Sequence, residues 1–166
     1  MVQSFHQTWG GSRCEVRPGA VQGPGRTPII AEEDATHPDV VPEDCLVLDP
    51  IDGTLSLMAG SPAFGIAVCL VRAGHPVQAV VDFPGYQVRL VATAGGEVSI
   101  VGDTGRLPRF DSRTVLTSPR QLTRVARLLA DHGPAGSTVT AMPTTTVKMT
   151  LVALGHAPAA AYLTAA

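Results

Sequence analysis

The hexapeptide Asp49-Pro50-Ile51-Asp52-Gly53-Thr54 carries two carboxylates three positions apart, directly after the apolar run at residues 45–48. Pro50 fixes its own φ and restrains Asp49 to an extended geometry, so both carboxylates are held at defined angles on one turn. Oxygen ligands of this kind suit a hard divalent cation such as Mg²⁺, and the carbonyl of Ile51 offers one more. The pattern therefore predicts a cation site.

The end of the hexapeptide favours a phosphate group. A helical turn that opens at Gly53 and Thr54 and runs through Leu57 would present free backbone amides and the positive end of the helix dipole to an anion. A metal pair bridging a phosphate, with a threonine hydroxyl positioning a water, is a standard arrangement for phosphoester hydrolysis. The simpler alternative is that Asp52-Gly53 is only a turn and Asp49 only a capping residue.

A third carboxylate lies upstream, where Ile29-Ile30 predicts a short strand that ends in the acids Glu32, Glu33 and Asp34. Further strands are predicted along the chain, separated by Gly- and Pro-rich turns. Because connections this short favour antiparallel neighbours, residues 60–101 are predicted to form an antiparallel meander. The predicted strands are residues 45–48, 64–72, 77–83 and 88–93.

Beyond Asp111 the pattern changes to alternating strands and helices. Ser118-Pro119 provides an N-cap and an N1 proline for a helix that Gly133 closes. Strands are predicted at residues 114–117 and 139–142, and a second helix at 146–154. We therefore expect three regions: a loose Gly/Pro-rich tail at 1–28, a metal-binding domain with an antiparallel sheet at 29–110, and a partial second α/β domain at 111–166.

Composition and charge limit the kinds of partner and the cellular location that can be expected. The net charge is −2 and the eleven arginines are scattered, which argues against a nucleic acid polymer. The apolar stretches are far shorter than the roughly 20 residues of a membrane span, and no secretory signal is visible. Cys14, Cys45 and Cys69 are expected to be reduced thiols, the latter two in the core. These features predict a cytoplasmic protein without a membrane partner.

Two segments together carry a resemblance to a known family. Ile30-Ala31-Glu32-Glu33, followed by Leu48 and the hexapeptide, resembles the paired signatures of the inositol monophosphatase superfamily. The similarity continues through residues 60–64 and 74–84, and reaches Lys148 and the run at 152–157. That run is most similar to the branch that hydrolyses 3′-phosphoadenosine 5′-phosphate. The resemblance covers residues 29–165 and is strongest in the first loop.

The resemblance implies an α+β layered sandwich of the αβαβα kind, here incomplete, and a Mg²⁺-dependent phosphomonoesterase. By resemblance, Glu32 is a metal ligand and a catalytic residue, Asp49 and the Ile51 carbonyl bind metal, and Asp52 binds metal and substrate. Gly53 and Thr54 bind the phosphate, Thr54 being catalytic as well. Thr145 lies where the family has substrate-binding residues.

The chain is expected to be truncated at both ends relative to typical members. A Trp-Asp motif that completes the second metal site and an N-terminal Val-Thr-x-x-Asp stretch are both missing, the region at Thr8-Trp9 having no match. The expected substrate is a small phosphorylated polyol, sugar or nucleotide, such as an inositol phosphate, and the expected assembly is a homodimer. A catalytically impaired metal- or ligand-binding remnant or fragment of such an enzyme is the alternative.

Other candidate residues are expected to be structural. The five histidines share no ligand spacing and are predicted to lie at the surface; they are His6, His37, His75, His132 and His156. Gly95-Gly96 is interpreted as a hairpin turn. The series Arg120, Arg124 and Arg127 is interpreted as the solvated face of its helix.

Overall fold

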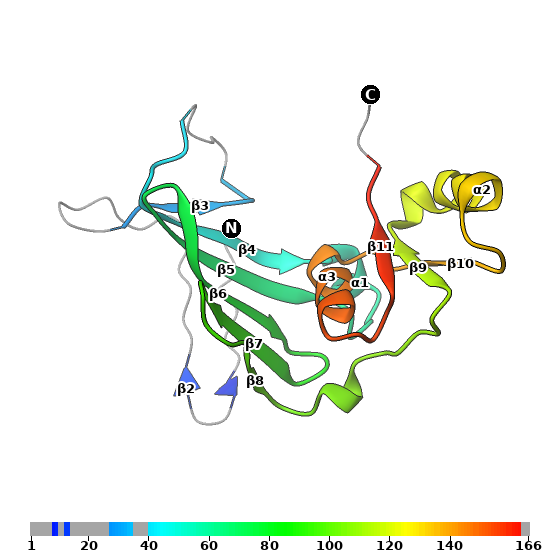
Figure 1. The fold of residues 1–166 in the computed structure, drawn as a ribbon. Coiled ribbons are helices and arrows are strands. Elements are labelled where there is room, and N and C mark those ends of the chain that lie inside the picture. The colour runs from blue at the N-terminus through cyan, green and yellow to red at the C-terminus, as the bar shows by residue number, and fades with distance from the viewer. Residues whose placement is uncertain (1–7, 10–11, 14–26, 35–39, 164–166) are drawn as a thin grey trace.

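A computed structural model describes residues 8–9, 12–13, 27–34 and 40–163. Its main element is a six-stranded sheet in the order β3-β4-β5-β6-β7-β8 (Figure 1). Apolar and β-branched residues dominate most of these strands, and turns rich in glycine join β5 to β8 in chain order. The strands are β3 (Ile29–Ala31), β4 (Cys45–Asp52), β5 (Gly65–Arg72), β6 (His75–Phe83), β7 (Val88–Thr93) and β8 (Ser99–Val101).

The predicted meander is confirmed, because β5, β6, β7 and β8 pair antiparallel with their chain neighbours. The sheet as a whole is mixed, however, since β3 pairs parallel to β4. Strand β4 also continues through the hexapeptide to Asp52, with a register shift against β5 between Asp49 and Asp52. The prediction of a turn at Asp49 was wrong, because pairing with β5 keeps this segment extended.

The chain after residue 111 forms a three-stranded parallel sheet in the order β10-β9-β11. Each parallel connection contains a helix, as such crossovers require. The elements are β9 (Thr114–Thr117), η2 (Pro119–Gln121), α2 (Leu122–His132), β10 (Thr138–Ala141), α3 (Thr145–Ala153) and β11 (Ala159–Ala161). The helix expected from Ser118 begins as the 3₁₀ turn η2, and Ser118 makes no side-chain cap bond.

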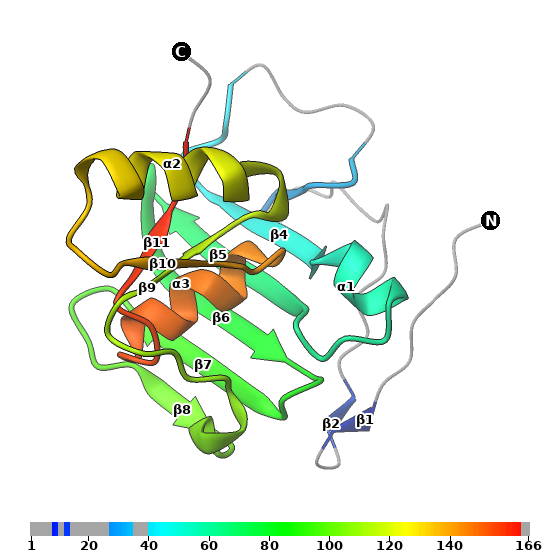
Figure 2. The same ribbon diagram turned by 90° about the vertical axis from the view of Figure 1, so that its right-hand side faces the viewer.

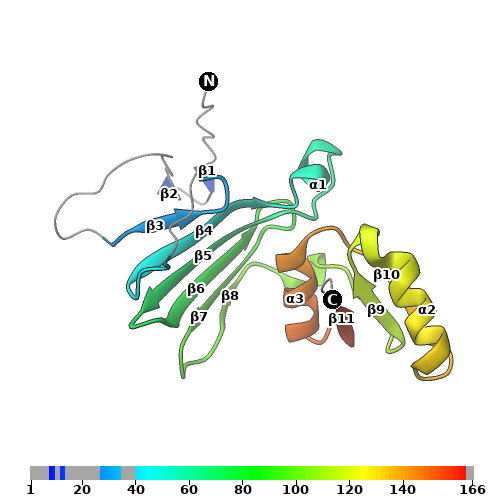
Figure 3. The same ribbon diagram turned by 90° about the horizontal axis from the view of Figure 1, so that it is seen from above.

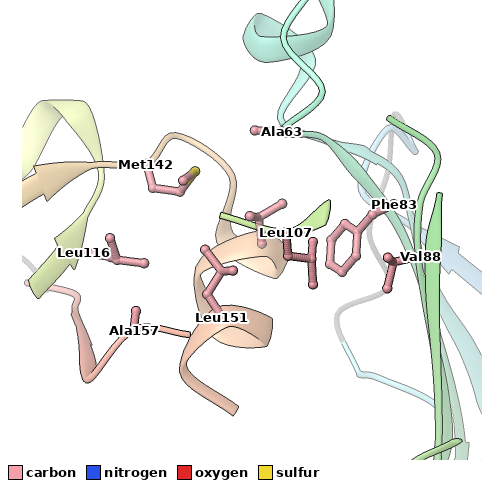
Figure 4. Packing of buried hydrophobic residues seen from close by; sticks show 9 residues of the cluster. Ala63, Phe83, Val88, Leu107, Leu116, Met142, Leu151 and Ala157 are labelled. Atoms are coloured by element: carbon pink, nitrogen blue, oxygen red, sulfur yellow. The ribbon is translucent and has the colours of Figure 1, made fainter. Parts of the chain in front are cut away.

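The elements stack in layers. Figure 3 shows the six-stranded sheet, α3, the three-stranded sheet and α2 following one another across the molecule. The shared core lies around α3, where Phe83 and Val88 of the first sheet meet Leu107 and Leu151, and Leu116 comes from the second sheet (Figure 4). The layered α+β fold is thus the one expected, and α3 is the element that joins the two sheets.

The face of the six-stranded sheet that is turned away from α3 carries an apolar row. Leu48, Val68, Val80 and Val91 are successive cross-strand partners on β4 to β7, and all four are half-buried. Their chain neighbours Val81 and Leu90 pack into the core, so the row points to the other face. None of the described helices lies against it (Figure 3).

Several smaller predictions have clear outcomes. Cys45 is buried, Arg120, Arg124 and Arg127 are exposed, and residues 95–96 lie in the turn between β7 and β8. His75 and His132 are exposed, but the surface prediction was wrong for His156, which is only 3% exposed after the end of α3. The remaining histidines and Cys14 lie outside the described residues.

Part of the predicted tail has structure. Thr8–Trp9 (β1) and Ser12–Arg13 (β2) form a short antiparallel pair that the sequence pattern did not indicate. Within the described residues, no helix has the length and apolar character to cross a membrane.

Candidate functional site

The end of β4 and the helix that follows it place the hexapeptide. Gly53 has φ +93° and turns the chain from β4 into the short helix α1 (Thr54–Met58), as Figure 2 shows. Asp49 Oδ1 accepts a 3.1 Å hydrogen bond from the Ile51 amide, and Thr54 Oγ1 donates a 3.2 Å hydrogen bond to the Ile51 carbonyl. These local bonds hold the irregular segment between Asp49 and Asp52, where β4 and β5 are out of register.

Glu32 reaches the same place because β3 pairs parallel to β4. The Glu32 amide donates a 3.1 Å hydrogen bond to the Leu48 carbonyl, which places Glu32 directly beside the residue that precedes Asp49. The Glu32 carboxylate is near enough to Asp49 to raise the pKa of that carboxyl. Both carboxylates line the same pocket.

All of the predicted site residues line one open pocket of about 580 Å³. Two further residues that the sequence did not single out as site residues, Glu33 and Thr146, line it as well. The predicted residues are Glu32, Asp49, Ile51, Asp52, Gly53, Thr54 and Thr145. Glu33 follows Glu32 in the acidic run, and Thr146 follows Thr145 in the threonine triplet at the start of α3. A search for runs of polar residues beside each predicted site residue would have found both.

The start of α3 forms the second wall of the pocket. Asp52 Oδ2 accepts a hydrogen bond from the Thr146 amide, which ties β4 to the first turn of α3. Thr144, the fully buried N-cap residue of α3, donates its hydroxyl to the Ala63 carbonyl. The pocket is therefore built jointly by the first sheet and by the helix that leads to the second sheet.

The neighbouring carboxylates of the pocket shift the pKa of Asp49. Burial raises the pKa of Asp49, and the carboxylates of Glu32 and Asp52 raise it further, from 3.8 to about 6, against a smaller opposing effect of the Ile51 amide. Two neighbouring negative charges thus make the ionised form of Asp49 costly. A bound cation would relieve this repulsion.

The donor set fits a hard divalent cation, since it consists of carboxylate, carbonyl and hydroxyl oxygens. Among the described residues, however, no group of three or more His, Cys, Asp or Glu side chains is gathered closely enough to hold a metal ion by itself. Glu32 raises the pKa of Asp49, whereas Asp52 accepts the hydrogen bond of the Thr146 amide. Glu32, Asp49 and the Ile51 carbonyl would be the main ligands of a cation, and Asp52 lies where the pocket meets α3.

The raised pKa of Asp49 predicts a pH dependence of stability in the cation-free protein. The native carboxyl keeps its proton up to about pH 6, whereas the unfolded chain releases it near 3.8. The contribution of Asp49 to the free energy of unfolding is therefore fully present below about pH 3.8 and is lost as the pH rises through about 6.

Asp49→Asn should consequently be more stable than the native chain at about pH 7.5, by about 1 kcal/mol after allowance for solvent screening of this half-buried group. The difference should disappear at about pH 4. Urea denaturation of both proteins in a chelator measures it, and a difference that is equal at the two pH values would contradict the assignment.

Comparison with known proteins agrees with this picture. Inositol monophosphatase-II from Staphylococcus aureus superimposes with a TM-score of 0.61 at 21% identity, over 78% of this chain and 52% of that one. The Thermotoga maritima inositol monophosphatase gives 0.58 at 20% identity, over 76% and 49%. At these identities the likeness concerns the fold. The class that they define is therefore a class of fold, the layered α+β sandwich.

Sequence comparison then gives the family. The chain belongs to the inositol monophosphatase family, whose model matches residues 22–164. The bifunctional phosphatase IMPL2 of Arabidopsis thaliana, a chloroplast protein, is 37% identical over 79 residues, which are 46% of this chain and 23% of that protein. A probable inositol 1-monophosphatase, ImpA of Mycobacterium tuberculosis, is 46% identical over 50 residues, 30% of this chain and 18% of that protein.

Members of this family are phosphoric monoester hydrolases. The chain spans about half the length of the solved structures it matches, and less than a third of the curated relatives.

Proposed function

We propose that this chain is a Mg²⁺-dependent phosphomonoesterase that hydrolyses a small phosphorylated polyol, sugar or nucleotide. The observation that carries the proposal is the single pocket in which Glu32, Asp49, Ile51, Asp52, Gly53, Thr54 and Thr145 come together. These residues come from three separate parts of the chain, so their meeting in one pocket is not a consequence of sequence proximity. Family membership supports the reaction class.

Each residue has a defined task in this proposal. Glu32 and Asp49 bind the cation with the Ile51 carbonyl, and Asp52 contributes from the α3 side. Mg²⁺, when bound, neutralises negative charge on the phosphoryl oxygens. Glu32 accepts the proton of the attacking water, because its side chain lines the pocket and is exposed to solvent.

The phosphate group is bound at the other end of the hexapeptide. The Thr54 hydroxyl, which donates a hydrogen bond to the Ile51 carbonyl, orients the attacking water. Gly53 allows the backbone to approach the phosphate closely, and Thr145 contacts the substrate from α3. The pocket thus offers oxygen atoms that can bind a cation, and amide and hydroxyl groups that can donate hydrogen bonds. This combination suits a phosphate held between a cation and the protein.

The proposal extends to the location, the assembly and the choice of substrate. The free thiols of Cys45 and Cys69 support a cytoplasmic location. The apolar row Leu48, Val68, Val80 and Val91, which none of the described helices covers, supports a homodimer. Similarity of the run at 152–157 to the nucleotide-hydrolysing branch keeps 3′-phosphoadenosine 5′-phosphate among the substrates to be tested beside inositol phosphate.

Phosphate release tests the proposal. The purified chain with Mg²⁺ is offered inositol 1-phosphate, fructose 1,6-bisphosphate and 3′-phosphoadenosine 5′-phosphate, and Asp49→Asn is the control. We expect release from at least one substrate, reduced about 10–100-fold in Asp49→Asn, the usual cost of weakening a metal site. Release that does not exceed the Asp49→Asn level would leave the catalytically impaired metal- or ligand-binding remnant as the function.

A further inference from the structure

Thr144 is fully buried at the N-cap of α3, and its hydroxyl does not make the bond that is usual at this position. A threonine at the N-cap commonly accepts a hydrogen bond from an amide of the first helical turn. The Thr144 side chain makes no such bond and donates instead to the carbonyl of Ala63, 81 positions earlier in the chain. The hydroxyl therefore joins two distant segments and does not cap its own helix.

A pocket residue takes over the capping of α3. Asp52 Oδ2 accepts the hydrogen bond of the Thr146 amide, and Thr146 is the second residue of the helix. A carboxylate in this position satisfies an amide that has no partner within the helix. Two hydrogen bonds thus attach the start of α3 to the first sheet, one to the end of β4 at Asp52 and one to the segment before β5 at Ala63.

A second buried hydroxyl extends this contact to α1. Ser56 is 4% exposed, and its Oγ lies 3.5 Å from Thr144 Oγ1. A hydroxyl has one proton to donate, and Thr144 gives its proton to Ala63. Ser56 is therefore the donor to Thr144, so the bonds run from α1 through Thr144 to the Ala63 carbonyl. In a buried site, hydrogen bonds arranged in such a chain strengthen one another.

The hydroxyl chain lies against the phosphate end of the hexapeptide. A Cβ on Gly53 would lie 3.2 Å from the Thr144 Cβ and 3.1 Å from the Ala63 carbonyl oxygen. Gly53 lines the pocket, as does Thr145, the residue that follows Thr144. Thr144 and Ser56 do not line it themselves. Any effect of the two hydroxyls on a ligand therefore passes through their neighbours.

We propose that Thr144 is a positioning residue of the pocket, which together with Ser56 holds the hexapeptide and the first turn of α3 at the separation that phosphate binding needs. This inference rests on the proposed function, in which Gly53 and Thr54 bind the phosphate and Thr145 contacts the substrate from α3. A group held from two sides depends on the distance between them, and a displacement of about 1 Å can cost about 100-fold in rate.

Calorimetry with inorganic phosphate at saturating Mg²⁺ tests the proposal. Thr144→Val keeps the shape of the side chain but removes the hydroxyl, and should bind phosphate about tenfold more weakly. Thr144→Ser keeps the hydroxyl and should stay within about twofold of the native chain. Thr150→Val alters another buried threonine of α3, one that does not line the pocket, and should leave the phosphate affinity unchanged. If Thr144→Val binds phosphate like the native chain, or Thr144→Ser loses as much affinity as Thr144→Val, the positioning role is overturned.

Ser56→Ala provides a second, milder variant. It removes only the donor to Thr144 and should weaken phosphate binding about threefold. Because Ser56 acts through Thr144, adding Ser56→Ala to Thr144→Val should cause no further loss of affinity, and two losses that simply add would contradict the hydroxyl chain. Should Thr144→Val fail to fold, an unchanged phosphate affinity of Ser56→Ala overturns the inference.

Phosphate binding and phosphate release are measured separately, which keeps this inference distinct from the proposed function. A native chain that hydrolyses none of the substrates, but whose phosphate affinity falls in Thr144→Val and is kept in Thr144→Ser, contradicts the proposed function and supports the positioning role. A Thr144→Val chain that binds phosphate and hydrolyses substrate like the native enzyme supports the proposed function and overturns the positioning role. A native chain that binds no phosphate also overturns it.

Discussion

Replacing Gly53 with alanine is expected to lower the free energy of unfolding by about 2–4 kcal/mol, from a left-handed backbone and from overpacking together. Gly53 has φ +93°, a conformation that a residue with a side chain adopts at a cost. A Cβ at this position would collide with the Thr144 hydroxyl and lie 3.1 Å from the Ala63 carbonyl. Because Thr144 begins α3, relief of the collision would separate the two walls of the pocket and weaken Mg²⁺ binding as well.

Gly60 provides a matched control for this prediction. It also has positive φ, at +71°, but a Cβ there would meet no atom within 4 Å. Gly60→Ala should therefore cost only the backbone term of about 1 kcal/mol and leave cation binding unchanged. Urea denaturation of the two variants measures the difference. Equal losses would show that the close approach of Gly53 to α3 contributes nothing to stability.

The sheet was largely predictable from the sequence, whereas the course of the hexapeptide was not. Strands β5 to β7 follow from short apolar runs and from the tight turns between them, which are local features. The extension of β4 to Asp52 depends on pairing with Gly65 of β5, a partner that the local sequence does not indicate. The parallel placement of β3 likewise depends on the long connection over residues 32–44, which gives the length that a parallel return needs.

The meeting of the site residues could be expected from their types and from family resemblance, but their surroundings could not. Glu32 and Asp49 were grouped because both supply hard oxygen ligands, and the pocket contains both. The hydrogen bond from the Thr146 amide to Asp52 and the burial of Lys148 in α3 arise only when α3 packs against the first sheet. Interactions between residues nearly a hundred positions apart leave no periodic signal in the sequence.

The largest loss of stability is expected for Phe83→Ala. Phe83 ends β6, is fully buried, and directs its ring from the first sheet toward Leu107 and α3 (Figure 4). The ring also packs over Gly65, where an added Cβ would lie 2.9 Å from it. Removal of a buried phenyl ring from such a site costs about 3–5 kcal/mol, because the surrounding backbone cannot close the cavity.

The position of the cavity gives the prediction a second readout. Loosening α3 from the sheet should move the Thr145–Thr146 wall, so Mg²⁺ binding should weaken even where the variant is still folded. Val91→Ala, in the half-buried row on the opposite face of the same sheet, should cost about 1 kcal/mol and leave Mg²⁺ binding unchanged. Urea denaturation and calorimetry separate the two variants. If Phe83→Ala loses stability but keeps the native Mg²⁺ affinity, the cation is held by the first sheet alone, and α3 serves the phosphate side of the pocket only.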